Sequence, residues 1–375
     1  MKKCASGLLL LLKKEKVFTI AALLAVISSI IVRPGAGVVS GIDFRTLVLL
    51  FGLMTVVAGL QGQLVFTKIG NVIISKVGNT LTLYLMLVLI CFVSAMVLTN
   101  DVALITFVPF TVMLLPMAGK KDKLPIIIIL QTIAANLGSV LTPLGNPQNL
   151  FIYNVSGMSL KEFVSWMLPL WLFSLILVAV PVFFLGKGKI DTPNVHKAPK
   201  GNRFKQVMYM LLFVCCLLSV FKVLDYRILF GIVVVCVVIF DSYTLLSVDY
   251  VLLLTFVGFF IFIYNMKQIP EVTGYISGIV AGREFAVGVL SSQVISNVPA
   301  AILLSGFTED MKTLLLAVDV GGLGTIIASM ASLISYKLYA ASSDSKPGKY
   351  MAFFTICNIV CLAIIYIFCK MWYHV

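Results

Sequence analysis

Charged residues are scarce in this sequence: Asp, Glu, Lys and Arg make up only 11% of its 375 residues, whereas 61% are hydrophobic. A soluble domain carries about a quarter charged residues. Apolar runs that approach the length needed to cross a bilayer, about 17 to 25 residues, recur from one end of the chain to the other. The composition therefore excludes an ordinary soluble domain and predicts an all-α polytopic membrane protein.

Residues that support common catalytic and metal chemistry are also few. The only two histidines, His196 and His374, lie in a polar loop and at the C-terminus, so neither can form a metal or proton site within the membrane. The eight cysteines lie mostly in apolar runs without a CxxC pair, which favours apolar packing over disulfides or metal binding. No GxxxxGK[ST] motif is present, so we expect no nucleotide. We expect no cofactor, apart from Na⁺ as a coupling ion.

An integral-membrane enzyme is an alternative from a different class. An intramembrane hydrolase or lipid transferase would need a paired His, Ser or carboxylate constellation at one depth. The apolar segments contain no histidine, and we find no nucleophile with a base in register. We therefore expect a protein that is not an enzyme.

The basic residues behind the net charge of +13 lie mainly in loops, which is typical of the positive-inside rule and not of nucleic-acid binding. The N-terminal stretch MKKCASGLLLLLKKEK has too short an apolar core for a signal peptide, and lysines stand where a cleavage site should be. We expect a protein integral to the plasma (cytoplasmic) membrane and surrounded by its lipid, with the N-terminus cytoplasmic and the C-terminus outside.

The chain divides into two halves at a basic polar loop. We predict a cytoplasmic lead-in over residues 1–16, a first transmembrane repeat over 17–186, a basic cytoplasmic linker over 187–206 and a second repeat over 207–375, with one extra helix at 207–222. Each half contains a short polar motif between two apolar runs, and then a longer interrupted segment. An odd number of crossings separates the halves, so the second should be inverted relative to the first.

The interrupted segment of the first half reads NLGSVLTPLGNPQNLFIY, Asn136 to Tyr153. Pro143 and Pro147 each remove a helical hydrogen bond, so the helix should break between Thr142 and Pro147. Irregular backbone is tolerated at membrane depth only where it lines a cavity or is buried in protein. Its free carbonyls can hold a cation, and the half-helix that starts near Pro147 can face an anion. A simple proline kink is the alternative. In the second half, Thr325 corresponds to Thr142 and Ser329 to Asn146.

The short polar motifs are predicted to be the tips of two re-entrant hairpins. They are Thr99-Asn100-Asp101 in the first half and Ser296-Asn297-Val298 in the second. Asn100 offers both a donor and an acceptor, so it can bridge an ion and a solute. Asp101 is an ionisable group at membrane depth, which is costly unless it is protonated or paired. Asp319 is a similar case, although Lys312 indicates a position nearer the outer surface.

These features together predict an inverted repeat with two re-entrant hairpins and two discontinuous transmembrane helices. Such a pattern is typical of secondary transporters, whose binding site lies near the bilayer midplane. With the motifs TND, SNVPA and LTPLGNPQNL, the chain resembles the ion transporter superfamily of divalent-anion/sodium symporters, citrate transporters, arsenite permeases and one class of sodium/proton antiporters. The resemblance covers nearly the whole chain after residue 16. It implies a homodimer in which one block moves like an elevator against a fixed dimerisation scaffold.

The resemblance also implies site residues. The first cation site would use Thr99, Asn100 and the Gly145 carbonyl, and the second would use Ser292, Asn297 and the Ala328 carbonyl. The solute would contact Asn100, Asn297, Asn146 and Ser329. The remaining tip residues complete the predicted set, with Ser296 and Asp101 at the cation positions and Asp101 and Val298 at the solute positions.

The sequence departs from the family pattern at two points. Carboxylate transporters of the superfamily usually have Ser-Asn-Thr at both tips, whereas the third tip residues are Asp101 and Val298 here. An ionised Asp101 would repel a carboxylate by about 4 kcal/mol at 4 Å with an effective dielectric constant of about 20. The second break, TIIASMAS (Thr325 to Ser332), lacks the family's proline and glycine. We therefore expect its helix to be less fully unwound than the first.

Our main hypothesis is a secondary active transporter of a small anion or organic acid of the citrate/dicarboxylate class, coupled to Na⁺ or H⁺. An arsenite efflux permease or a Na⁺/H⁺ antiporter with the same fold is the alternative, and Asp101 favours it. No arginine or lysine in the apolar segments is predicted to meet the anion. Its recognition would then depend on helix ends, amides and bound cations.

Overall fold

The computed structural model describes residues 15–32, 36–66, 78–188, 201–342 and 345–375. Within these ranges every regular element is a helix, which confirms the predicted all-α class. The first half contains α2 (Lys16–Val32), η1 (Ala36–Gly41), α3 (Phe44–Gly62), α5 (Thr80–Leu98), α6 (Asn100–Met117), η2 (Lys121–Lys123), α7 (Leu124–Gly138), η3 (Ser139–Leu141), α8 (Pro147–Ser156) and α9 (Leu160–Phe183). The second half contains α10 (Arg203–Val220), α11 (Tyr226–Asp241), η4 (Ser242–Ser247), α12 (Tyr250–Lys267), α13 (Pro270–Val280), α14 (Glu284–Ile295), α15 (Asn297–Ser305), α16 (Met311–Val320), α17 (Met330–Ala340) and α18 (Pro347–Tyr373).

Nine helical segments of the described residues are long and apolar enough to cross a membrane. The outer helices leave large apolar side chains uncovered: Ile239 of α11 is 65% exposed and Ile367 of α18 is 59% exposed. In a soluble protein such faces would drive aggregation, whereas a lipid bilayer covers them. The chain is therefore an integral membrane protein, as its composition predicts.

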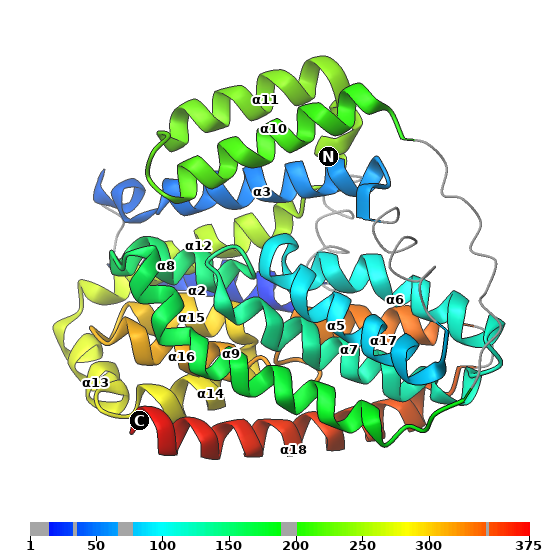
Figure 1. Cartoon of the computed structure of the whole chain (residues 1–375). Coiled ribbons are helices and arrows are strands. Elements are labelled where there is room, and N and C mark those ends of the chain that lie inside the picture. Colours follow the sequence, from blue (N-terminus) through cyan, green and yellow to red (C-terminus); the bar gives the residue numbers. More distant parts are fainter. Residues whose placement is uncertain (1–14, 33–35, 67–77, 189–200, 343–344) are drawn as a thin grey trace, which may run out of the picture.

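The helices form two groups (Figure 1). In one, α3 packs against α10 and α11 at the top of Figure 1, and α2 packs along α12. In the other group, α5, α6, α7 and α9 pack together, and α17 packs against both α6 and α7. α14 packs against α15 and α16 in the same group. α18 runs along the lower edge in Figure 1. The groups meet where α8, which packs against α15 and α16 of the second group, contacts α3, and where α15 contacts α12.

Small residues allow close approach of helices within both groups. A Cβ atom at Gly258 of α12 would lie 3.1 Å from the backbone and side chain of Ala21 on α2. One at Gly138, the last residue of α7, would lie 2.0 Å from the carbonyl oxygen of Phe92 on α5. This distance is shorter than any normal contact between a Cβ atom and a backbone oxygen, so no larger residue fits at this position. Gly138 therefore fixes how closely α7 lies against α5.

Candidate functional site

The first predicted break is confirmed. α7 ends at Gly138, η3 follows, Thr142 and Asn146 are extended, and α8 begins at Pro147. The Thr142 hydroxyl donates a hydrogen bond to the carbonyl oxygen of Met96. Asn146 caps α8, because its side-chain oxygen accepts a hydrogen bond from the Asn149 backbone N–H at 3.0 Å. The segment is buried in protein, which is the condition for irregular backbone at membrane depth.

Asn149 holds the broken end of α7 in place. Its side-chain Nδ2 lies 3.3 Å from the carbonyl oxygen of Ser139, 3.4 Å from that of Val140 and 3.2 Å from that of Thr142. These carbonyls have no helical partner, because the chain leaves the helix at this point. Asn149 is fully buried. It therefore supplies the donor that water would supply at an exposed helix end.

We expect Asn149→Leu to lower the melting temperature of the detergent-purified protein. Buried carbonyls would lose their donor, at a cost of about 1 to 3 kcal/mol for each group left unpaired. The matched control is Asn358→Leu, because Asn358 is equally buried but donates only to Phe354 of its own helix, α18. Equal melting temperatures for the two variants would contradict this role of Asn149.

The second break is wider than the sequence predicts. α16 ends at Val320 and α17 starts at Met330, so residues 321–329 are not helical. The expectation of a less fully unwound helix is wrong. The glycines that permit the break precede the TIIASMAS stretch: Gly321, Gly322 and Gly324, the last at φ +103°. Gln293 of α14 stabilises the turn, since its amide nitrogen donates to the carbonyls of Gly321 and Leu323, both at 2.9 Å.

The two tips have matching backbone geometry. Thr99 has φ 75° and ψ 150°, and Ser296 has φ 76° and ψ 154°. This region is uncommon for residues other than glycine, and it persists where the surroundings impose it. The Asn100 N–H donates to the Gly145 carbonyl at 3.0 Å, and the Asn297 N–H donates to the Ala328 carbonyl at 2.9 Å. Each tip is therefore bonded to the break of its own half.

Asn136 joins the two halves. Its side-chain oxygen accepts hydrogen bonds from the Asn100 amide at 3.0 Å and from the Ser329 hydroxyl at 2.9 Å. Its side-chain nitrogen lies 3.5 Å from the carbonyl oxygen of Gly322 in the second break. The second tip is close by, because a Cβ atom at Gly322 would lie 3.0 Å from the Asn297 side-chain nitrogen. Both tips and both breaks therefore meet around one buried asparagine.

A second polar cluster surrounds Asp319. This carboxylate is 2% exposed, so it is buried within the protein. One of its oxygens, Oδ1, accepts a hydrogen bond from Gln148 Nε2 at 3.1 Å and one from Asn146 Nδ2 at 3.4 Å. Asn146 Nδ2 also donates to the Ser139 hydroxyl at 3.0 Å. The first break thus contacts the last turn of α16.

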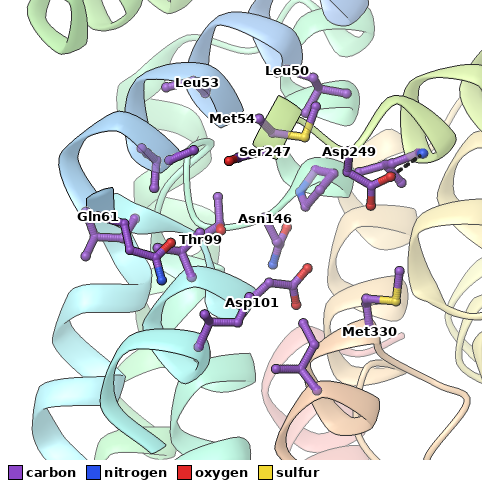
Figure 2. A pocket seen from close by; sticks show the side chains of 18 of the residues that line it. Leu50, Leu53, Met54, Gln61, Thr99, Asp101, Asn146, Ser247, Asp249 and Met330 are labelled. Atoms are coloured by element: carbon purple, nitrogen blue, oxygen red, sulfur yellow. Dashed lines mark hydrogen bonds between the residues drawn. The ribbon is translucent and has the colours of Figure 1, made fainter. Parts of the chain in front are cut away.

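A cavity of about 290 Å³ lies beside the first tip, between the two groups of helices. Figure 2 shows Thr99, Asp101 and Asn146 around this space, with Asp249 at the start of α12 and residues of α3 at its border. Asp101 is half-buried, and its Oδ1 has no hydrogen-bond partner. Lys337, in the last turn of α17, also lines the cavity. A basic side chain is therefore present where the sequence predicted none.

The predicted site residues are distributed unevenly around this cavity. Thr99, Asp101, Asn146 and Pro147 line it, and Asn100 and Ser329 belong to the buried cluster behind it. Most of the site residues predicted in the second half do not line the cavity: Ser292, Ser296, Asn297, Val298, Thr325 and Ala328. Within that set the Ser292 hydroxyl donates to the Gly288 carbonyl at 2.8 Å, and the Ser296 hydroxyl donates to the Ala328 carbonyl at 3.2 Å.

The carbonyls predicted to bind cations are already hydrogen-bonded. Gly145 O accepts from the first tip and Ala328 O from the second. A carbonyl oxygen has two lone pairs, so Gly145 O, which accepts one hydrogen bond, can still bind a second partner. Ala328 O accepts from both the Asn297 N–H and the Ser296 hydroxyl, so a cation there would have to replace one of these donors.

Four amide residues of the site are absent from the set predicted from the sequence: Asn136, Gln148, Asn149 and Gln293. All are amides inside or beside apolar stretches, and this is the signal that could have revealed them. Asn136, Gln148 and Asn149 lie in the interrupted segment itself. Gln293 precedes the second tip by three residues.

The described chain is all-helical, and its two broken helices surround a buried polar centre. A cavity lies next to this centre, between two helix groups. These features define the class of polytopic membrane transporters. The chain is a member of the citrate transporter family, which matches residues 8–330. The resemblance to the ion transporter superfamily is thereby confirmed.

Three relatives are similar over different lengths. An uncharacterized transporter of Methanocaldococcus jannaschii is 30% identical over 337 residues, which cover 88% of this chain and 91% of the relative. The inner membrane protein YbiR of Escherichia coli is 32% identical over 311 residues, 80% of this chain and 81% of the relative. A putative transporter arsB of Dictyostelium discoideum is 28% identical over 126 residues, 33% of this chain and 22% of the relative.

Proposed function

We propose that this protein is an ion-coupled secondary transporter that moves a small anion or organic acid of the citrate/dicarboxylate class by an elevator mechanism. The observation that carries the proposal is the junction at Asn136, where the first tip, the first broken helix and the second break share one set of buried hydrogen bonds. Buried polar groups at membrane depth are costly and are retained for function.

The depth of this junction supports re-entrant hairpins in an inverted repeat. Asn136 lies about three helical turns beyond Leu124, the start of α7, which follows the charged η2 segment. At 1.5 Å per residue this is about 18 Å from the end of the helix, beyond the middle of a hydrocarbon core about 30 Å thick. Asn100 bonds directly to Asn136, so the first tip lies at that depth as well.

The location of the cavity supports the elevator mechanism. Its lining comes from α3, η4 and the start of α12 on one side, and from the first tip, α8 and α17 on the other. We assign α2, α3 and α10 to α12 to the fixed scaffold, where a homodimer contact would form, and the remaining helices to the moving block. The cavity includes Gln61, near the end of α3, and Lys337, in the last turn of α17. We assign both helix ends to the cytoplasmic side, on which the N-terminus is expected, so this state would open inward.

Charge in the cavity favours an anion accompanied by a cation. The N-terminus of α8 and Lys337 attract a carboxylate, whereas Asp101 and Asp249 repel it. A Na⁺ or H⁺ on Asp101 would remove part of this repulsion. Solute and cation would then bind together, which is the basis of coupling.

We expect proteoliposomes containing the wild-type protein to accumulate labelled citrate or a dicarboxylate when a Na⁺ or H⁺ gradient is imposed. Asn100→Ala should abolish this uptake, because Asn100 links the first tip to Asn136. Asn202→Asp is the control, since Asn202 is exposed and caps α10 through an oxygen that aspartate retains. Uptake that continues without any gradient would rule out coupled transport.

A second candidate function is arsenite efflux or Na⁺/H⁺ exchange. Two carboxylates at the centre, Asp101 and Asp319, favour it over a simple carboxylate symporter, and one relative is named a putative arsB transporter. Growth of an expressing strain on arsenite and on high sodium separates the alternatives. Protection on either medium, together with no uptake of any carboxylate, would replace the main proposal.

A further inference from the structure

We propose that Asp319 is a proton-binding site, in which the protonated carboxyl group forms a cyclic acid–amide pair with Gln148. In such a pair the amide N–H donates to the carbonyl oxygen of the acid, and the acid O–H donates to the amide oxygen. The site deepens the proposed function, because it names the proton as a coupled ion. The existence of the pair is independent of transport, whereas its role in coupling rests on the proposed function.

Half of this pair is visible, and the atoms of the other half have no partner. Gln148 Nε2 donates to Asp319 Oδ1 at 3.1 Å. Asp319 Oδ2 and Gln148 Oε1 are both buried without a hydrogen-bond partner. Both atoms are acceptors when Asp319 is ionised, so neither can satisfy the other. One proton on Oδ2 converts it into a donor and provides Gln148 Oε1 with a partner.

Burial makes the neutral acid the more stable form at this place. Asp319 is 2% exposed and Gln148 is 1% exposed, and an ionised carboxylate away from water needs a cationic partner. Among the described residues, no lysine or arginine forms an ion pair with Asp319. The carboxylate accepts hydrogen bonds from the neutral side chains of Gln148 and Asn146.

Most titratable groups on the elements that pack against α16 belong to α18. α7 and α15 contain none, α8 contains Tyr153, and α14 contains Glu284, which accepts hydrogen bonds from Gly282 N–H and the Thr308 hydroxyl. α16 itself has Lys312 in its first turn, where the carbonyl of that residue accepts a hydrogen bond from Trp166. The titratable residues of α18 are Lys349, Tyr350, Cys357, Cys361, Tyr366, Cys369, Lys370 and Tyr373. None of these groups is hydrogen-bonded to Asp319.

A proton suits this environment better than Na⁺. The groups that face Oδ1 are the N–H donors of Gln148 and Asn146. Donor groups repel a metal ion, which needs several oxygen ligands, but they suit the carbonyl oxygen of a neutral acid. On the other side of the carboxylate, the pair offers two unpaired oxygens, Asp319 Oδ2 and Gln148 Oε1. One proton can bridge these two oxygens, whereas a metal ion needs more oxygen ligands than the pair supplies.

The pair connects proton binding to the solute cavity. Gln148 belongs to the first turn of α8, and Asn146, which caps α8 and also bonds to Asp319, lines the cavity. Asp319 takes its proton from water and returns it to water, as an acid–base equilibrium without any other reactant. When the proton leaves, the bond between Asp319 Oδ2 and Gln148 Oε1 is lost and two acceptors face each other, whereas the N–H groups of Gln148 and Asn146 stay on Oδ1. The contact between the start of α8 and α16 therefore changes its geometry. Proton release and the shape of the solute site are linked in this way.

The test is infrared spectroscopy of the purified full-length protein at neutral pH, in sodium-free buffer and in sodium buffer. We expect an absorption band of a protonated carboxyl group that Asp319→Asn abolishes. Asp310→Asn is the matched control, because Asp310 is the exposed N-cap of the same helix and asparagine can keep the cap. Gln148→Leu should keep the band but shift it to the frequency of an acid without a hydrogen-bonded O–H group, which tests the pair even if Asp319→Asn does not fold.

Three outcomes would overturn the proposal: no protonated band in the wild type, a spectrum of protonated carboxyl groups that Asp319→Asn leaves unchanged, or an Asp319 band that appears only after sodium is removed. A separate transport measurement tests the role in coupling. We expect Asp319→Asn to bind the solute but to lose acceleration of its uptake by a pH gradient. An unchanged response to the pH gradient would overturn that role. Absence of binding of any anion by the wild type would instead refute the proposed function, and would leave the proton site standing.

Discussion

Gly145→Ala is expected to abolish transport and to lower the melting temperature more than any other single methyl addition in the first break. A Cβ atom at this position would lie 1.9 Å from the carbonyl oxygen of Ser139 and 2.6 Å from its carbonyl carbon. Both are backbone atoms, so no side-chain rotation can relieve the overlap. The loop over residues 142–146 would have to move, and with it the Gly145 carbonyl that accepts from the N–H of Asn100.

Gly231→Ala is the matched control for this prediction. Gly231 lies within α11, and a Cβ atom there would meet nothing within 4 Å. Alanine is favoured over glycine in a helix by about 1 kcal/mol. The control should thus unfold at the same temperature as the wild type or at a higher one. If Gly145→Ala also unfolded at the wild-type temperature and transported normally, the described path of the first break would be wrong.

Asn136→Leu is expected to have the second large effect. It should lower the affinity for the solute more than it lowers the expression level of the protein. Leucine has the same branched shape, with methyl groups in place of the amide oxygen and nitrogen, but no acceptor, so the Asn100 side-chain amide and the Ser329 hydroxyl would each lose a buried hydrogen bond. Each unpaired group costs about 1 to 3 kcal/mol, and 1.4 kcal/mol corresponds to about tenfold in affinity. We therefore expect affinity for the solute to fall at least about tenfold in a calorimetric titration.

Two comparisons show whether the effect belongs to the junction. Asn358→Leu makes the same chemical change at a fully buried site on α18, outside the cluster, and should leave affinity unaltered. Ser329→Ala removes one donor and leaves Asn136 bonded to Asn100, so its effect should be smaller than that of Asn136→Leu. Equal affinity for Asn136→Leu and the wild type would show that the junction does not hold the solute site.

Local chemistry made the first break predictable. Proline has no N–H and glycine permits turns, so Pro143, Gly145 and Pro147 indicate irregular backbone whatever packs around them. The short polar motifs between apolar runs likewise predicted an interruption at Thr99 and at Ser296, where α5 and α14 end. The resemblance to the superfamily depended on these motifs, and the family match confirms it.

Features that depend on contacts between distant segments were not predictable. In the sequence, Asn136 does not differ from the other polar residues of the interrupted helix. Only the folded chain shows that it is hydrogen-bonded to Asn100 and Ser329. The second break was misjudged because its stabilisation comes from the Gln293 side chain on another helix. Asp319 was expected nearer the outer surface because Lys312 precedes it, and only the folded chain shows that its carboxylate is buried against Gln148 and Asn146.

The central claim, that the buried junction of tips and breaks forms a binding site for an anion together with a cation, is tested most directly by calorimetry. The purified protein is titrated with citrate and a panel of dicarboxylates, with and without Na⁺, at two pH values. We predict that at least one anion binds, that its affinity depends on Na⁺ or on pH, and that Asn100→Ala and Asn297→Ala each remove binding. Binding that is unaffected by both substitutions, or by both ions, would contradict the account.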